Sequence, residues 1–298
     1  MKKLLAIGVL ISTALITGCY YGPCMSGSGQ VITEMRDITG FTEVRSGADF
    51  EVYVTQADDY NVEVVAYENL MPIIETYISG YSLIIETKNN SCYKSGLPIK
   101  VFVSLPELNL LELNGSGMLV AEVSEGESLE CGNSGSGYLA VDTVFAKNLY
   151  LSNSGSGSIG MEKIYSNEVR MIQSGSGSID SGEVLESKGV SIKHSSSGNV
   201  RSNVVGGLNV NAILSGSGRI DLSGDVHKAD YTLTASGRID ALDLMAYDAR
   251  TTSSGSGLIY VWATENLEAT VSGSGDILYR GEPSTSFWVI GSGSIRPY

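Results

Sequence analysis

The sequence predicts an all-β fold: a right-handed parallel β-helix of about ten 20-residue coils with an irregular N-terminal β cap. A Ser-Gly-Ser-Gly stretch recurs about every twenty residues, an aliphatic residue follows each copy at a fixed distance, and apolar and polar residues alternate between copies. Fixed periods in this range are typical of stacked repeats. Strict alternation is typical of strands with one buried face. The right hand is expected from the twist that governs parallel crossovers.

The Ser-Gly-Ser-Gly stretch, sometimes degraded, runs from residue 114 to the end of the chain at residue 298. Its last glycine recurs at intervals of 18 to 21 residues, at Gly117, Gly137, Gly157, Gly177, Gly198, Gly218, Gly237, Gly257, Gly275 and Gly293. We expect each stretch to form a corner between two short strands, with the glycine at positive φ. The serine hydroxyls are expected to bond nearby backbone or the serine one coil away.

An aliphatic residue stands two positions after every marked glycine. The ten are Leu119, Leu139, Ile159, Ile179, Val200, Ile220, Ile239, Ile259, Ile277 and Ile295. Positions six before the glycine are mostly apolar and have the same parity, so both should point inward. The ten aliphatic residues are therefore predicted to stack as one internal ladder, each contributing roughly 1.5–3 kcal/mol if fully buried.

Residues 37–113 lack the Ser-Gly signature but are predicted to be strands that cap the coil and form its first, irregular turns. Residues 74–86 read as a hairpin around Ser79 and Gly80, and residues 99–105 as a further strand. A short helical turn is expected over 67–71. At the other end, Phe287, Trp288 and Tyr298 either cap the rod or leave an apolar end that pairs with another molecule.

The N-terminus predicts export and lipid anchoring. Two lysines precede an apolar run from Leu4 to Ile16, which is too short to span a bilayer comfortably and is typical of a signal peptide. Small residues before Cys19 resemble a bacterial lipobox, which implies cleavage after residue 18 and lipid on Cys19. Residues 1–18 are thus predicted to be a lipoprotein signal peptide and 19–36 a lipidated N-terminus and linker. An ordinary signal peptide is the alternative, and Tyr20 favours the outer membrane.

Composition excludes several classes of function. The formal charge of −14 makes nucleic acid an unfavourable partner. Only two histidines and no Asp-rich loop are present, so no metal site and no cofactor is expected. Of the cysteines after Cys19, Cys131 falls at an inward position, whereas Cys24 and Cys92 lie in loop-like stretches. An envelope location permits a disulfide, and we expect it between Cys24 and Cys92.

One outer stripe gathers charged residues. Positions flanking the aliphatic ladder carry Asp180, Arg201, Arg219, Asp221, Arg238 and Asp240. Asp221 and Asp240 should be about 5 Å apart on adjacent coils, a separation that retaining glycosidases use for two carboxylates. The favoured alternative is that these arginines and aspartates form ordinary cross-strand ion pairs.

Several segments together resemble the GIN-domain family, also called auto-transporter adhesin head domains. The resemblance covers about residues 38–275, and it is carried by residues 40–44, 49–52, 68–70, 99–103 and 105–108 and by the Gly-Ser-Gly repeats. It implies a β-helix on bacterial envelope proteins, often lipoproteins, with no established activity.

These observations predict a non-enzymatic cell-envelope lipoprotein whose rigid β-helical rod serves adhesin-like binding or surface structure, with a glycan or protein ligand. One alternative is a carbohydrate-active β-helix, a polysaccharide hydrolase or lyase, that uses Asp221 and Asp240 with nearby arginines. Another is a structural oligomer joined through the C-terminal edge.

Overall fold

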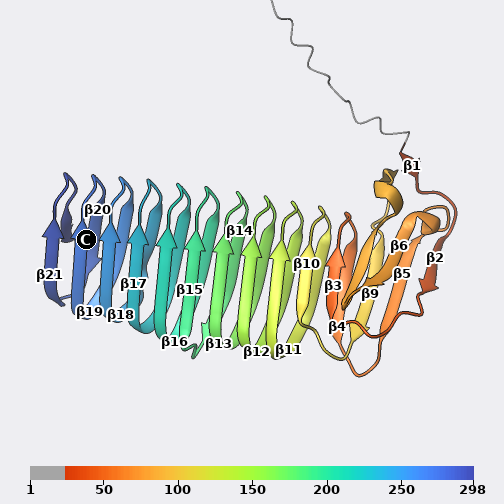
Figure 1. Ribbon diagram of the computed structural model, residues 1–298, viewed down its shortest axis with the longest axis horizontal. Helices are drawn as coiled ribbons and strands as arrows, with labels where there is room; N and C mark the ends of the chain where they lie inside the picture. The colour runs from red at the N-terminus through yellow and green to blue at the C-terminus, as the bar shows by residue number, and fades with distance from the viewer. Residues whose placement is uncertain (1–23) are drawn as a thin grey trace, which may run out of the picture.

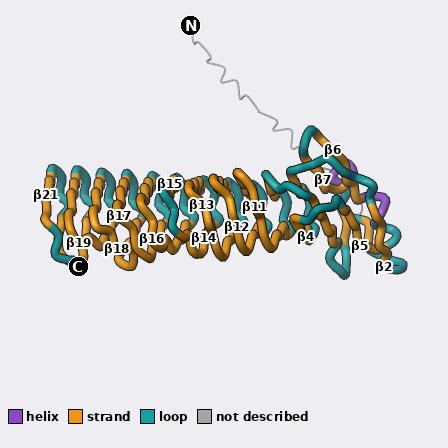
Figure 2. The backbone as a smooth tube through the Cα atoms, turned by 90° about the horizontal axis from the view of Figure 1, so that it is seen from below, coloured by secondary structure: helices purple, strands orange, loops and turns teal. Residues whose placement is uncertain are grey.

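The computed structural model describes residues 24–298, which form a rod of stacked coils with a broader block of strands at one end (Figure 1). The chain is nearly all-β and winds through about nine turns of a β-helix. Figure 2 shows successive coils lying side by side along the rod. The predicted β-helix is confirmed, including the irregular N-terminal section that precedes the regular coils.

The strands of the N-terminal block are short. They are β1 (Met25–Ser26), β2 (Val31–Met35), β3 (Glu43–Ser46), β4 (Glu51–Gln56), β5 (Asn61–Tyr67), β6 (Ile74–Ser79), β7 (Ser82–Thr87), β8 (Tyr93–Lys94) and β9 (Lys100–Leu105), with 3-10 turns η1 (Met71–Ile73) and η2 (Lys88–Asn90). The rod consists of β10 (Leu110–Leu113), β11 (Met118–Asn133), β12 (Tyr138–Asn153), β13 (Ser158–Gln173), β14 (Ser178–Leu185), β15 (Gly189–His194), β16 (Asn199–Leu214), β17 (Arg219–Leu233), β18 (Arg238–Ser253), β19 (Leu258–Val271), β20 (Asp276–Arg280), β21 (Ser284–Val289) and β22 (Ile295–Pro297).

Each regular coil has three inward-facing sections rather than the two that the sequence suggests. In β12 the buried pairs are 139 and 141, then 144 and 146, then 149 and 151. The parallel ladder between β11 and β12 skips one residue at each bend, at 122 and at 127 on β11. The middle section was not expected, because each bend adds one unpaired residue and so shifts which residues point inward. No glycine or proline at these two positions marks the bends.

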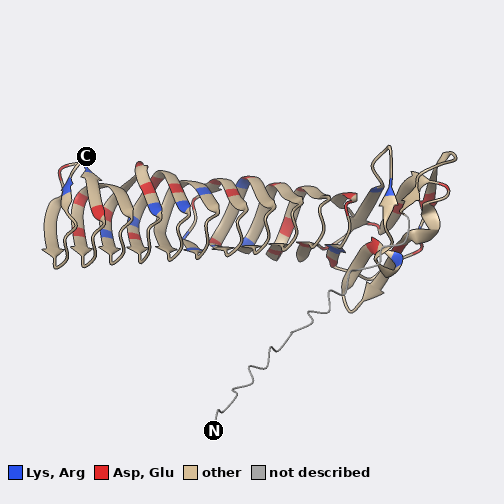
Figure 3. Ribbon diagram, turned by 90° about the horizontal axis from the view of Figure 1, so that it is seen from above, with Lys and Arg blue, Asp and Glu red and all other residues tan. Residues whose placement is uncertain are grey.

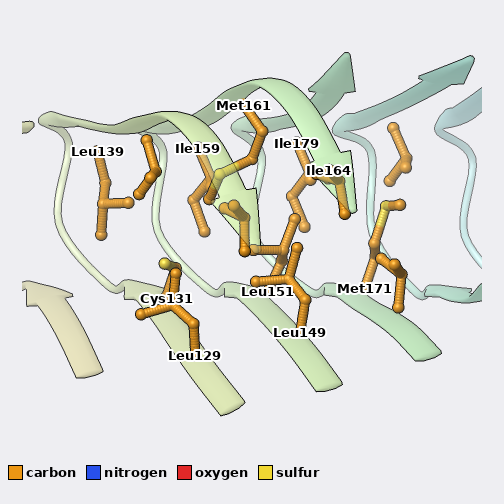
Figure 4. Packing of buried hydrophobic residues seen from close by; sticks show 14 of the residues in the cluster. Leu129, Cys131, Leu139, Leu149, Leu151, Ile159, Met161, Ile164, Met171 and Ile179 are labelled. Atoms are coloured by element: carbon orange, nitrogen blue, oxygen red, sulfur yellow. The ribbon is translucent and has the colours of Figure 1, made fainter. Parts of the chain in front are cut away.

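The ten aliphatic residues of the predicted ladder lie in register on successive coils. Leu139 pairs with Ile159, which pairs with Ile179, and Figure 4 shows these side chains pointing into the core. Nine of the ten are buried, and Ile295 on the last coil is half-buried. The third section supplies a facing column that includes Cys131, Leu151 and Met171. The core is therefore one continuous apolar column along the rod.

The corner glycines do not adopt the positive φ that the sequence analysis predicts. None of the ten marked glycines is among the residues with positive φ between 24 and 298. They are required instead by the contact between coils. A Cβ on Gly137 would overlap the carbonyl oxygen of Gly117, and a Cβ on Gly157 would overlap that of Gly137. The corner serines mostly point outward, and Ser292 with Ser274 is one pair that bonds across coils, at 3.1 Å.

A column of buried polar side chains supports the corners from inside. It consists of Asn133, Asn153, Gln173 and His194, all at most 1% exposed. The Asn153 amide donates to the carbonyl oxygens of Gly157 (2.8 Å) and Ser178 (3.1 Å), and its Oδ1 accepts from the Gly155 N–H. The His194 Nε2 lies 2.6 Å from the Gly198 carbonyl oxygen. These side chains add a further hydrogen bond to corner backbone groups, such as the Gly155 N–H and the Gly157 carbonyl oxygen, that also bond to the neighbouring coils.

The N-terminal block closes one end of the rod. Strand β4 lies between β9 and β11, and β3 lies between β7 and β10, so the first coil is inserted between the block and the regular coils. Strand β5 then pairs antiparallel with β9, and β2 with β5. The hairpin over 74–86 forms as β6 and β7, while the helical turn falls at η1 instead of 67–71. The stretch 19–36 is no plain linker, because β1 and β2 lie within it.

Candidate functional site

The six residues of the predicted charged stripe lie together on one outer face of β14, β16, β17 and β18. Asp180, Arg201, Asp221 and Asp240 stand in register on these four strands, and Arg219 stands in register with Arg238. Four of the six, Asp180, Arg201, Arg219 and Asp221, line a hollow of about 440 Å³ together with Ser178 and Asn199. The sequence therefore placed these residues correctly on adjacent coils.

The arginines of this stripe already bind its carboxylates. Arg201 donates to Asp180 (3.2 Å), and Arg219 donates to Asp221 and to Asp240 (3.2 Å). The hydrogen bond with Asp221 raises the pKa of Arg219. Arg238 donates to Asp240 at 2.7 Å and lies 4.2 Å from the centre of the Tyr260 ring. Both guanidinium groups donate to the same oxygen of Asp240, Oδ2, and this arrangement fits the ion-pair alternative.

A larger hollow, of about 650 Å³, lies over a different part of each coil. Its lining residues come from five successive coils: Gly126, Phe145, Ala146, Lys147, Tyr165, Ser166, Asn167, Leu185, Glu186, Val205 and Gly206. We call it the aromatic groove. The spacing of the repeat does not predict this groove.

Two exposed rings form the centre of the aromatic groove. Phe145 and Tyr165 stand in register on β12 and β13, with ring centroids 4.8 Å apart and planes inclined by only 8°. They are 42% and 43% exposed. Leu185 and Val205 continue the same row on the next coils. A run of exposed apolar side chains on an acidic rod marks a binding surface better than scattered single residues do.

Polar groups border this apolar row. Lys147 lies in the groove and pairs with Glu127 at 2.6 Å, and Asn167 and Glu186 contribute an amide and a carboxylate. The one interval of 21 residues places its extra residue here, between β14 and β15. Glu186 takes φ 51° at that point, a left-handed conformation that is strained for a residue other than glycine. Such strain is concentrated at functional sites.

A signal for the aromatic groove was present in the sequence. Phe145 and Tyr165 are one period apart at an outward position, and no other adjacent coils of the regular repeat carry aromatic side chains there. Alternation alone classes both as ordinary surface residues. The pair becomes visible only when outward residues at equivalent positions on successive coils are aligned, as the inward residues are.

The cysteines separate into a bridge and a buried thiol. Cys24 and Cys92 form a disulfide with Cα atoms 4.6 Å apart, which joins the start of the described chain to the N-terminal block. Cys131 is fully buried, and burial raises the pKa of its thiol well above the ordinary value. The signal peptide over 1–18 and Cys19 lie outside the described residues. Within 24–298, no helix is long and apolar enough to cross a membrane.

Comparison with known proteins supplies the family. The family model described as "Putative auto-transporter adhesin, head GIN domain" matches residues 40–213 and 163–283, which together are most of the chain. The chain belongs to this GIN-domain family. The resemblance stated from the sequence is therefore confirmed. No curated protein matches the chain.

Solved structures agree with the GIN-domain fold. A "putative lipid binding protein" from Parabacteroides distasonis ATCC 8503 is 26% identical, with a TM-score of 0.54, and the match covers 93% of this chain and 100% of that one. Adhesins titled "putative" from Parabacteroides merdae ATCC 43184 (20% identity, TM-score 0.55) and Parabacteroides distasonis ATCC 8503 (21%, 0.57) match over the same shares. The latter two show the fold alone.

Proposed function

We propose that this GIN-domain protein is a non-enzymatic lipoprotein of the cell envelope, anchored through Cys19, whose rod binds glycans in an adhesin-like manner. The observation that carries the proposal is the aromatic groove around Phe145 and Tyr165. The family supports a surface role, and the lipobox before Cys19 supports anchoring, most simply in the outer membrane.

The chemistry of the aromatic groove suits a sugar. The apolar C–H faces of a pyranose ring pack against aromatic and aliphatic side chains, and the ring hydroxyls need hydrogen-bond partners at the edge. Tyr165 and Val205 offer the first surface, while Asn167 and Glu186 offer acceptors and donors beside it. Neutral or amino sugars fit better than uronates, because the rod is strongly acidic.

The ion pairs around Asp240 argue against the carbohydrate-active alternative. A retaining glycosidase needs one protonated carboxyl and one free carboxylate. Here Arg219 and Arg238 both donate to Asp240, and Arg219 also donates to Asp221. We therefore expect binding without turnover.

A glycan array followed by calorimetry tests this proposal on the chain from Tyr20 onward, which contains every described residue. The Phe145→Ala and Tyr165→Ala variants should each weaken binding about tenfold, since an aromatic contact contributes about 0.5–1.5 kcal/mol beyond its buried area. Tyr138→Ala is the matched control, because Tyr138 is 47% exposed and lies on another section of the coil. Equal losses in all three variants would reject the groove as the site.

Two further measurements address catalysis and anchoring. Release of reducing ends from any bound glycan, abolished by Asp240→Asn, would replace the binding proposal with the enzymatic alternative. Incorporation of labelled palmitate into the full chain, lost in Cys19→Ser, is the expected result for the anchor. Equal labelling of Cys19→Ser would refute lipidation at that residue.

A further inference from the structure

The last coil of the rod leaves one strand edge open. Strand β21 pairs with β19, and all six of its residues are exposed. The Ile290 N–H donates to the Val271 carbonyl oxygen in β19. Because successive residues of a strand direct their N–H and C=O groups to opposite sides, Ser286 and Trp288 also direct theirs toward β19. Thr285, Phe287 and Val289 consequently direct theirs away from the rod. No other strand within residues 24–298 pairs with this side.

The core is also uncovered at this end. Phe287 and Val289 stand in register with Ala269 and Val271, two fully buried residues of the preceding coil. They hold the same inward positions, yet they are 37% and 50% exposed. Ile290 beside them is 80% exposed. Phe287 therefore does not cap the rod, and no side chain within residues 24–298 fully covers the end of the apolar column.

Strand β21 lacks the devices that normally protect an edge. Charged residues, prolines and bulges keep most edge strands from pairing. The sequence from Ser284 to Ile295 contains no charged residue and no proline, although the chain as a whole carries −14. Neighbouring β22, in contrast, contains Arg296 and Pro297. The opposite end of the rod is closed by β2 and β5, where Glu34 and Arg36 form an ion pair.

We propose that the C-terminal coil is a self-association surface on which β21 pairs antiparallel with β21 of a second copy. The unpaired backbone donors and acceptors of β21 can hydrogen-bond to an extended strand of a partner. The exposed apolar residues at the end of the core would be buried best by a partner whose end has the same coil cross-section and the same inward apolar residues. A second copy meets both conditions, and a two-fold axis makes the contact self-complementary. Two acidic rods would repel each other along their sides, so the uncharged strand β21 is where they can meet.

Light scattering and small-angle X-ray scattering on the chain from Tyr20 onward test this proposal, because acyl chains cannot then hold copies together. We expect twice the monomer mass and roughly twice the maximum dimension. Thr285→Pro should restore the monomer with unchanged thermal stability, because Thr285 directs its N–H away from β19 and loses no internal bond. Thr285→Lys, which places like charges across the interface, is the second variant and should also be monomeric.

Thr33→Pro is the matched control at the other end. Thr33 is an exposed residue of edge strand β2, and its N–H likewise points away from its neighbour β5. This variant should remain dimeric. A wild-type chain that is monomeric at every concentration overturns the proposal. So does a dimer that survives both Thr285 variants, or one that only Thr33→Pro dissociates.

Discussion

Gly135 lies directly against the carbonyl oxygen of Gly115 on the preceding coil, in the space that a Cβ would fill. The same relationship joins Gly155 to Gly135 and Gly175 to Gly155. Backbone hydrogen bonds hold the contact: the Ser156 and Gly157 N–H groups both donate to Gly135, each at 3.1 Å. The corner repeats because coils stacked this closely leave no space for a side chain.

Gly155→Ala should therefore destabilise the rod strongly. Its methyl group would overlap the Gly135 backbone, which cannot yield as a flexible side chain could. Overpacking costs about 1–3 kcal/mol or more, and urea unfolding measures the loss. Gly126→Ala is the control, because a Cβ at Gly126 meets nothing within 4 Å and its φ is not positive. A stability change within about 0.5 kcal/mol is expected there.

The Asn153 side chain should be important for stability because it is buried inside the rod. Asn153→Ala removes two hydrogen bonds that the amide donates to carbonyl oxygens and one that its Oδ1 accepts from the Gly155 N–H, a loss of about 1–3 kcal/mol in total. Asn153→Leu should cost less than Asn153→Ala, because Leu113 and Leu214 occupy the same column on other coils. Thermal unfolding of both variants checks the order; the reverse order would contradict this role.

Reduction of the Cys24–Cys92 bridge should loosen the N-terminal block. The bridge closes a loop of 68 residues, for which chain entropy predicts about 4 kcal/mol. The Cys24→Ser/Cys92→Ser variant should unfold at a lower temperature than wild type, and a reducing agent should not shift it further. Thiol labelling of the chain from Tyr20, unfolded but unreduced, should modify only Cys131. Modification of three cysteines would disprove the bridge.

Alkaline pH should destabilise the fold through two buried groups. Burial raises the pKa of both Cys131 and Tyr231 in the folded state, so the unfolded chain ionises first and stability falls as pH rises. The loss begins at about pH 8.5 for the cysteine and at about pH 10 for the tyrosine. Tyr231→Phe should remove only the second loss. The variant should also gain up to about 1 kcal/mol near neutral pH, because the Tyr231 hydroxyl has no hydrogen-bond partner.

Unfolding by urea at several pH values measures this effect. Tyr138→Phe is the control, since Tyr138 is 47% exposed. A loss above pH 10 that is as large in Tyr231→Phe as in wild type would contradict the assignment.

The inward columns were predictable from sequence because burial constrains them directly. Ile159 and its equivalents recur at a fixed distance from the glycine, and no other arrangement buries them all. The middle section around Val144 and Ile164 escaped notice because its bends need no special residue. The corner glycines were predicted to have positive φ, whereas they are required by close contact between coils. The sequence alone does not distinguish these two reasons for a glycine.

Outward columns were predictable only in part. The period gave the adjacent-coil pair of Arg219 with Asp240, whereas Arg238 and Asp240 pair within one strand. The aromatic groove depends in addition on the left-handed Glu186 and on the depth of the surface beside Phe145. Neither property is periodic, so neither can be deduced from the spacing of residues.

The identical register of β11, β12 and β13 makes the length of the rod a discrete quantity. Loss or duplication of one twenty-residue period shortens or extends the rod by one strand spacing, about 4.8 Å. Both ends keep their own structure, because the strands of a regular coil form their backbone ladders with the two adjacent coils. The reach of such a molecule can therefore change by recombination within its gene, in equal steps, while the surface at its tip is inherited intact.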